Sequence, residues 1–218
     1  PHGLPHDPFK SCVVPRPIGW ISTVDSQGRH NLAPYSQFQN VTFNPPIVMF
    51  SANQNTGGQR KDSVRNAEET GEFVWNMATY ALRDAVNKSA EELPHGVDEF
   101  EHAGLVKLPS RKVKPMRVAG SPIQFECVYL NTLRFPGVPP MGTADVVFGR
   151  VVAIHIDDEV IDGQGMLDIL KIQPLARMGY FDYTFVDNKF EMVIGGNNSA
   201  LLAGLEGSPD KAKAATQR

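Results

Sequence analysis

The sequence holds 218 residues with a formal net charge of −3, and 41% of them are hydrophobic while 21% are charged. This length suits one sizeable domain or two small ones, and the proportions are ordinary for a globular protein, which excludes a disordered or fibrous chain. The small negative charge gives no general attraction to nucleic acid or to acidic membranes, so we expect neither as a partner.

Cysteine usage and hydrophobic patterning indicate the compartment. Cys12 and Cys127 are too few and too far apart for a disulfide framework or a metal knuckle. No stretch approaches the roughly 20 apolar residues that span a bilayer, and the opening PHGLPHDPFK lacks the apolar core of a secretory signal. We therefore expect a cytoplasmic protein with both thiols reduced.

The first 40 residues predict an arm followed by a hairpin. Residues 1–15 are rich in Pro and His and lack periodicity, so we expect an extended arm, anchored on the body by Phe9. Arms of this kind often cross to a partner subunit. Residues 18–24 (IGWISTV) and 31–39 are strand-like, and the turn at 25–28 between them contains a glycine.

The next stretch alternates strands and helices. Paired prolines at 45–46 interrupt the chain before a short apolar strand at 47–50, and a Gly-Gly loop then leads to a helix that starts near Asp62. Gly71 suits the helix C-cap, and residues 72–77 predict a strand. Apolar residues at near-helical spacing predict a second helix over 80–90.

The second half of the chain is mostly extended. Residues 91–115 look irregular, with an acidic turn at 97–102, whereas 123–133 and 144–157 predict long strands that pair antiparallel. A short helix at 166–170 and an extended segment at 181–193 follow, and residues 206–218 form a polar tail that we expect to fray. Six or seven strands with few helices predict a mainly β, antiparallel barrel in one domain over residues 1–205, rather than a doubly wound sheet.

The stretch 47–66 carries the first candidate site. Arg60 and Lys61 stand at a helix start, where their charges oppose the positive end of the helix dipole. An anion would remove this conflict, and the free N–H groups of the helix start, the glycine loop and the Ser63 hydroxyl would help to bind it. A phosphate-binding cradle is thus one interpretation. A solvated, slightly strained helix end is an equally good one on these residues alone.

Hydroxyl and amide side chains recur near the predicted strand ends. Such groups could hold a flat heteroaromatic ring by its edge, with Trp20, Phe38 or Phe43 over its face. The alternative is a polar barrel rim without a ligand. The side chains concerned are Ser22, Thr23, Ser36, Gln37, Gln39, Asn40 and Ser51.

Other common chemistries lack support. Gly163-Gln164-Gly165 has Asp168 where a dinucleotide fingerprint needs its third glycine, so any nicotinamide partner is not held in the Rossmann manner. His95, Asp98, Glu99 and His102 have metal-like spacing, but a solvated acidic turn capped by Asp98 explains them better, and we expect no metal. The sequence has no G-x-S-x-G elbow, and neither cysteine has a His or Lys arrangement near it in the sequence that would indicate an activated thiolate, so hydrolase chemistry is unsupported.

The motifs in their order resemble a known family. The segments PRPIGWISTVDSQGRHNLAPYSQFQNVTFNPPIVMFS and KDSVRNAEETGEFVWNM, with GVDEFEHAGL, SPIQFEC and FGRVVAIHIDD further along, are similar to flavin reductase-like proteins. The resemblance extends to about Tyr183. It implies a homodimeric, FMN-binding Greek-key split barrel with a few peripheral helices, in a group that includes NAD(P)H:flavin oxidoreductases and flavoredoxin.

The resemblance also implies a set of cofactor-binding residues. The ring is expected against residues 20–23 and beside residues 36–40, the ribityl chain and phosphate among residues 51–52 and 60–63, and an Arg-Pro pair and a C-terminal element close by. This sequence has Gln37 and Gln39 at two positions where members of the family often carry Phe at the first and Phe or Asn at the second. The residues are Arg16, Pro17, Trp20, Ile21, Ser22, Thr23, Ser36, Gln37, Phe38, Gln39, Asn40, Ser51, Ala52, Arg60, Lys61, Asp62, Ser63, Arg177, Met178 and Tyr183.

The expected function is that of an NAD(P)H:FMN oxidoreductase. NADH or NADPH would be the co-substrate and the electron acceptor is unknown; no catalytic side chain is named, because hydride transfer is the chemistry of the flavin itself. A flavoredoxin-like FMN carrier that is reduced by a partner protein is the alternative. A third hypothesis is a split barrel that binds haem or pyridoxal phosphate instead.

Overall fold

The computed structural model describes residues 2–54, 58–139 and 142–193. The chain divides into a compact unit over Pro1–Asp187 and a second unit from Asn188 onward, and the following concerns the first. The predicted domain end at 205 and the polar tail lie outside the described residues. Within the described ranges, no helix has the length and apolar character to cross a membrane.

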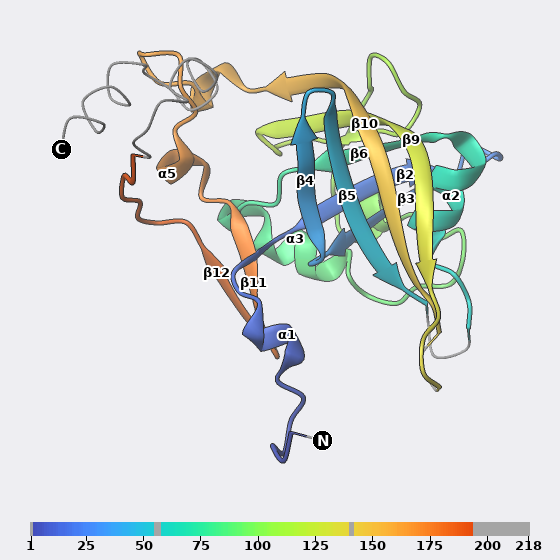
Figure 1. The fold of residues 1–218 in the computed structure, drawn as a ribbon. Helices are drawn as coiled ribbons and strands as arrows, with labels where there is room; N and C mark the ends of the chain where they lie inside the picture. Colours follow the sequence, from blue (N-terminus) through green and yellow to red (C-terminus); the bar gives the residue numbers. More distant parts are fainter. Residues whose placement is uncertain (1, 55–57, 140–141, 194–218) are drawn as a thin grey trace. The chain divides into compact units, whose positions relative to one another are not determined.

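A seven-stranded antiparallel sheet dominates the first unit (Figure 1). Its long central pair, β9 and β10, confirms the predicted antiparallel pairing. In spatial order the strands are β3 (His30–Tyr35), β2 (Gly19–Val24), β6 (Glu72–Asn76), β9 (Ile123–Phe135), β10 (Ala144–Ile156), β5 (Pro46–Asn53) and β4 (Phe38–Phe43).

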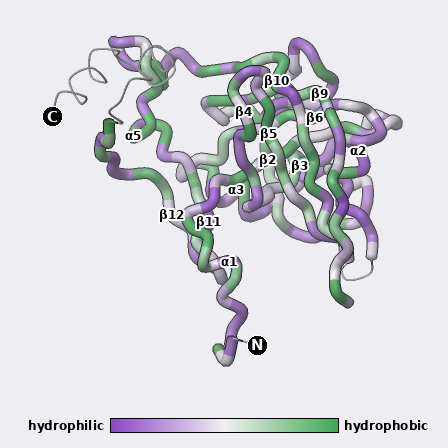
Figure 2. Tube along the Cα trace, viewed as in Figure 1, coloured by the Kyte–Doolittle hydropathy of each residue, from purple (hydrophilic) through white to green (hydrophobic). Residues whose placement is uncertain are grey.

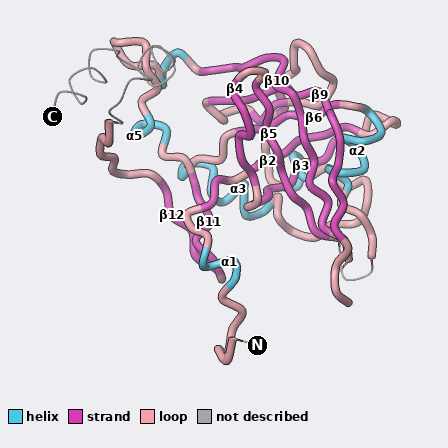
Figure 3. The backbone as a smooth tube through the Cα atoms, in the orientation of Figure 1, coloured by secondary structure: helices cyan, strands magenta, loops and turns pink. Residues whose placement is uncertain are grey.

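The sheet is coiled but not closed. Over the described part of the chain, the edge strands β3 and β4 form no ladder with each other, so the sheet, whose strands are magenta in Figure 3, does not close. The mainly β, split-barrel prediction is therefore confirmed. Figure 2 shows hydrophobic residues along the strands, as expected where one face of each strand packs inward.

Strand β2 lies at the centre of the fold. All six of its residues are buried, because the strand pairs on both sides, with β3 and β6. A Cβ on Gly19 would come within 2.9 Å of the Phe38 side chain, so glycine permits this close approach. Phe38 in turn stacks on Trp75 with ring centroids 5.1 Å apart and planes inclined by 3°. β2 thereby joins two hydrophobic clusters, one around Ile21 and the other around Trp20.

Helix α2 (Asp62–Thr70) confirms the prediction at both ends. It begins at Asp62 and ends at Gly71, whose φ of 77° lies in the left-handed region that glycine adopts freely. The Gly71 N–H closes the helix on the Ala67 carbonyl at 3.0 Å. The remaining helices are short: α1 (Phe9–Cys12), η1 (Tyr80–Leu82), α3 (Arg83–Lys88), α4 (Glu99–His102), η2 (Asp158–Val160) and α5 (Ile169–Ile172).

Two small sheets were not expected from the sequence. One orders its strands as β1 (Arg16–Pro17), β11 (Leu175–Gly179) and β12 (Asp182–Phe185). The other pairs β7 (Lys107–Leu108) with β8 (Arg117–Val118). These strands are too short for an alternating pattern to reveal them.

Several first-half predictions need correction. The arm is not extended throughout, since it contains α1, and Phe9 is 76% exposed rather than anchored. The single segment predicted over 31–39 is divided, with β3 and β4 at opposite edges of the sheet. The division falls at Ser36–Gln37, where the Gln37 carbonyl accepts a hydrogen bond from Ser51 N. The helix predicted over 80–90 forms as η1 followed by α3.

Later segments differ less. The short helix predicted at 166–170 forms at Ile169–Ile172, after Asp168 caps it by accepting from Lys171 N. Only Asp182–Phe185 of the extended segment 181–193 is a strand. The acidic turn at 97–102 contains α4, with Asp98 as its N-cap as predicted.

Candidate functional site

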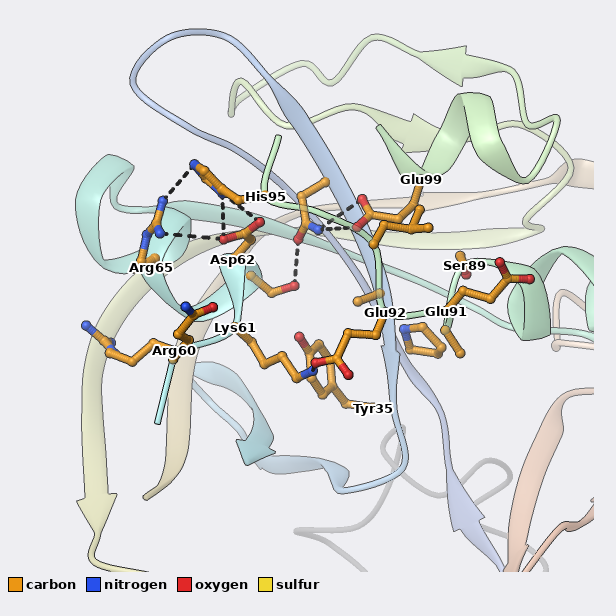
Figure 4. A pocket seen from close by; sticks show the side chains of 17 residues that line it. Tyr35, Arg60, Lys61, Asp62, Arg65, Ser89, Glu91, Glu92, His95 and Glu99 are labelled. Atoms are coloured by element: carbon orange, nitrogen blue, oxygen red, sulfur yellow. Dashed lines mark hydrogen bonds and ion pairs between the residues drawn. The ribbon is translucent and has the colours of Figure 1, made fainter. Parts of the chain in front are cut away.

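A cavity of about 590 Å³ opens at the start of α2 (Figure 4). One wall is residues 59–65, which include the predicted cradle. Strand β3 contributes Asn31 near its start and Tyr35 at its end, and the segment 89–95 lines the cavity as well. The cavity therefore brings together the predicted cradle and a segment that the sequence left irregular.

The helix start offers backbone donors to this cavity. Lys61 is the N-cap, extended at φ −63° and ψ 141°, and its side chain does not cap the helix. Its carbonyl accepts from Val64 N and Arg65 N, both at 3.1 Å. The N–H groups of Asp62 and Ser63 belong to the first turn and have no acceptor within the helix. Donors of this kind, beside cationic side chains, fit a phosphate group.

Arg60 is held from behind by two carboxylates. Its Nη2 lies 2.5 Å from Glu68 Oε2, and its Nε lies 3.3 Å from Asp145 Oδ2. Asp145 is only 1% exposed, and it also receives Arg134 Nε at 2.7 Å. Arg60 thus has a defined position, although its charge is already compensated by the protein.

Lys61 reaches across the cavity. Its Nζ lies 3.5 Å from the Glu92 carboxylate, and Figure 4 shows the two side chains directed toward one another. The Lys61 side chain is 35% exposed and that of Glu92 is 67% exposed. An ion pair of such length and exposure is weak, so the Lys61 charge is accessible to a ligand.

Ser63 faces a buried polar group rather than solvent. It is 1% exposed, and its hydroxyl donates to Asn31 Oδ1 at 2.7 Å. The Asn31 amide donates to both carboxylate oxygens of Glu99 at 3.0 Å, and Leu32 N donates to the same carboxylate. Burial raises the pKa of Glu99 above its ordinary value, and these hydrogen bonds offset the effect only in part.

His95 joins the two walls. Its Nδ1 lies 2.9 Å from both Asp62 carboxylate oxygens, and its Nε2 lies 3.1 Å from Arg29 Nη2 and 3.2 Å from Arg65 Nη2. Because two guanidinium groups can only donate, Nε2 accepts and Nδ1 carries the proton toward Asp62. His95 therefore fixes the far end of the segment 89–95 against α2.

Tyr35 covers the inner end of the cavity. Burial raises the pKa of its hydroxyl, which therefore stays neutral at physiological pH. Its ring lies 5.2 Å from that of Phe50, centroid to centroid. Tyr35 thus provides a neutral aromatic surface beside the charged groups.

The residues predicted to meet the flavin ring on β2 are all interior. Trp20, Ile21, Ser22 and Thr23 are each 0% exposed. Trp20 Nε1 donates to Ser89 Oγ at 2.9 Å, and the Ser22 hydroxyl donates to the Met116 carbonyl at 2.6 Å. Their side chains therefore support the fold, and a contact between them and a ring stays a prediction.

The second predicted ring segment is more accessible. Ser36 and Gln37 are half-buried, Gln39 and Asn40 are exposed, and Phe38 is in the core. Ser51 is half-buried on the neighbouring β5, whereas Ala52 is 2% exposed. Ser36 and Gln37 lie between β3 and β4 and the others lie on β4 and β5, and the part of all of them in binding stays a prediction.

The predicted C-terminal element meets the Arg-Pro pair in the small sheet. Arg16 pairs with Arg177, and Pro17 with Ala176, across β1 and β11. Arg177 Nη1 donates to the Tyr183 hydroxyl at 2.6 Å, and Met178 is half-buried beside it in sequence. The structure thus brings these predicted residues together, but as a group of their own that does not line the cavity.

The metal-like residues have separate partners. Asp98 caps α4, Glu99 binds Asn31, and His102 Nε2 lies 2.8 Å from Glu91. Among the described residues no cluster of three or more metal-binding side chains forms. Cys127 is fully buried, which raises the pKa of its thiol, so it offers no thiolate.

Sequence reasoning missed one wall of the cavity and the support behind the cradle. Glu92 is 31 residues from Lys61, and Asp145 is 85 residues from Arg60. Neither carboxylate belongs to a motif. Only the acidic composition of residues 91–92 gave a signal, and it does not indicate a partner.

The fold is an antiparallel split barrel, with a cavity at the start of α2. The family model described as "Flavin reductase like domain" matches residues 11–184, so the chain belongs to the flavin reductase-like family. The resemblance expected from the sequence is confirmed. Membership supports a flavin as the cofactor and an oxidoreductase as the class of protein.

Relatives and solved structures agree with this family. An uncharacterized protein of Aquifex aeolicus is 34% identical over 83% of this chain and 90% of its own, and YwrF of Bacillus subtilis is 31% identical over 85% and 90%. The crystal structure of nitrilotriacetate monooxygenase component B from Bacillus cereus matches with a TM-score of 0.79 and 30% identity, over 84% and 90%. Flavoredoxin of Desulfovibrio vulgaris, at 18% identity over 83% and 91% and a TM-score of 0.70, shares the fold.

Proposed function

We propose that this chain is an NAD(P)H:FMN oxidoreductase that binds FMN by its phosphate at the start of α2. The observation that carries the proposal is the cradle itself, with first-turn N–H groups, an accessible Lys61 and a compensated Arg60 around one cavity. Membership of the flavin reductase-like family supports a flavin as the cofactor. The monooxygenase component B and the 2-nitrobenzoate 2-nitroreductase NbaA among the structural neighbours are redox proteins by name.

Each part of the site has a role in this function. Lys61 and the first-turn N–H groups would hold the phosphate by charge-assisted hydrogen bonds, and Asp145 would keep Arg60 in place behind it. Tyr35 and the polar wall of Asn31 and Glu99 would exclude bulk water from the inner end. A bound flavin supplies hydride transfer, so the chain needs to orient it and needs no acid or base of its own.

Stopped-flow mixing tests the reductase activity. FMN-loaded protein is mixed anaerobically with NADH or with NADPH, and the flavin absorption band is followed; free FMN without protein is the control. We expect at least one nucleotide to bleach the band. If neither does so while FMN is bound, the chain is instead a carrier that a partner protein reduces, as the flavoredoxin-like alternative states.

We also propose that the working form is a homodimer in the cytoplasm. Large apolar side chains are exposed on β4, β9 and β10, among them Phe43 at 70%, Phe135 at 53% and Ile154 at 53%. Single exposed residues are common, but several on one sheet support burial against a second copy. Light scattering would give twice the 24.0 kDa chain mass for a dimer, and the chain mass alone would refute it.

A further inference from the structure

The cations of the cradle all have anionic partners within the chain. Arg60 is ion-paired with Glu68 and Asp145, Lys61 with Glu92, and Arg65 lies 3.8 Å from Asp62. A ligand phosphate therefore adds little charge compensation unless it replaces one of these carboxylates.

These ion pairs differ in how easily a phosphate can replace the carboxylate. Asp145 is 1% exposed on β10 and binds two arginines, so it is fixed in the fold. Asp62 is held by His95 at 2.9 Å. The Glu92 side chain is 67% exposed and forms an ion pair with Lys61 at 3.5 Å. Glu92 is thus the carboxylate that a phosphate can displace.

The segment that carries Glu92 is fixed at both ends. Ser89 is 1% exposed, accepts a hydrogen bond from Trp20 Nε1 and donates to the Val86 carbonyl. His95 is bound to Asp62 and faces two arginines. Glu92 is therefore tethered close to the cradle and stays near Lys61 at a high effective concentration, even after displacement.

We propose that Glu92 is an internal competitor for the phosphate and that it promotes FMN exchange by lowering FMN affinity. This inference rests on the proposed function. A carboxylate that returns to Lys61 favours release of the phosphate, and its charge repels the bound dianion. The competition acts in the same way on oxidised and reduced FMN, and it affects only ligands that carry the phosphate.

Paired titrations test this proposal. FMN and riboflavin, which lacks the phosphate, are titrated into the wild-type protein, Glu92→Gln and Glu159→Gln, and FMN retention on a desalting column is measured for each. Glu159 is exposed on η2 outside the cavity lining, so its variant matches the change in net charge.

We expect the wild type to lose FMN on the column. Glu92→Gln should bind FMN roughly 3- to 10-fold more tightly and release it more slowly, the range for removal of an exposed ion pair and its repulsion. Riboflavin affinity, and both affinities of Glu159→Gln, should stay within about twofold of wild type.

Three results would overturn the inference. Stoichiometric FMN retained by the wild type through desalting contradicts exchange, and unchanged or weaker FMN binding by Glu92→Gln contradicts competition. An equal gain for riboflavin shows that Glu92 does not act through the phosphate. Failure of the wild type to bind either flavin is a separate outcome, which refutes the proposed function as well.

Discussion

Two sets of backbone N–H groups in the described part of the chain, in the loop 111–113 and at the start of α2, differ in whether the chain itself supplies their acceptor. In the loop 111–113, the N–H groups of Arg111, Lys112 and Val113 donate to the Glu126 carboxylate at 2.8, 2.6 and 3.2 Å, and His155 Nε2 lies 2.5 Å from it. At the start of α2, the first-turn N–H groups face a cavity. The first site is filled by the chain itself, whereas the second leaves room for a ligand.

The two sites differ in whether their backbone donors have hydrogen-bond acceptors, and not in their charge. Burial alone would raise the pKa of Glu126, but the N–H of Arg111, the His155 side chain and the N–H of Lys112 outweigh burial and hold the pKa below its usual range. Glu99 has fewer such donors beside the cavity, and burial raises its pKa. Donors that the chain itself satisfies therefore indicate a structural site, and donors without an acceptor in the chain indicate a binding site.

The largest effect is expected from removal of the Glu126 carboxylate, which accepts the hydrogen bonds of the loop 111–113. Glu126→Ala leaves three N–H groups, that of the buried Val113 among them, without their carboxylate acceptor and removes the buried partner of His155, so we expect a loss of about 3 kcal/mol in unfolding free energy, measured by urea denaturation at pH 7. Because the folded pKa is lowered, the contribution is present above the ordinary value of 4.5 and disappears as pH falls through the folded pKa. A variant as stable as wild type at pH 7 would show that the loop does not need this carboxylate.

A substitution at the start of α2 should change ligand affinity rather than stability. Lys61→Ala removes the accessible cation, so FMN affinity should fall about 10- to 100-fold, the equivalent of one charge-assisted hydrogen bond of about 1.5–3 kcal/mol. Riboflavin affinity and the urea midpoint should not change. A parallel loss for riboflavin would place Lys61 outside the phosphate contact.

Glu99 should give stability a pH dependence opposite to that expected from Glu126, and Glu99→Gln should remove it. The raised folded pKa means that the wild type gains stability as pH falls through that pKa toward 4.5, and loses it as pH rises. The glutamine variant should lack this dependence and differ from wild type by no more than about 1 kcal/mol at pH 7. Denaturation curves at several pH values would reveal a retained dependence, which would assign it to another group.

The smallest effect is expected at Ser63. Its hydroxyl proton is directed to Asn31 Oδ1 at 2.7 Å, so Ser63→Ala should lower FMN affinity by less than about threefold, within the worth of a neutral hydrogen bond. This sharpens the sequence-based expectation, which gave Ser63 the same importance as Lys61. Calorimetric titration that finds an effect as large as that of Lys61→Ala would show that the hydroxyl turns to the phosphate.

Local sequence patterns predicted those features of the fold that depend on residues close together in the chain. The boundary of α2 at Gly71 and the pairing of β9 with β10 followed from capping chemistry and from long strand-like segments. The cradle followed from two cations at a helix start. The division between β3 and β4 escaped notice because Ser36–Gln37 carries no strong turn residue.

Long-range placement was beyond the sequence. Asp145 and Glu92 meet the cradle from 85 and 31 residues away, and no spacing rule connects them to Arg60 or Lys61. The burial of Trp20 and Ser22 depends on β2 pairing on both sides, which no single strand discloses. The sequence thus located the helix start at Asp62, and the structure supplied the carboxylates that pair with Arg60 and Lys61 beside it.

The most direct test of phosphate binding at the start of α2 compares two flavins on the unaltered protein. FMN and riboflavin share the ring and the ribityl chain, and only FMN offers the phosphate to Lys61 and the first-turn N–H groups. Fluorescence titration of the wild type should give an FMN affinity at least about tenfold higher than that of riboflavin, as one charge-assisted contact requires. Equal affinities would contradict the account, since the cradle would then contribute nothing to flavin binding.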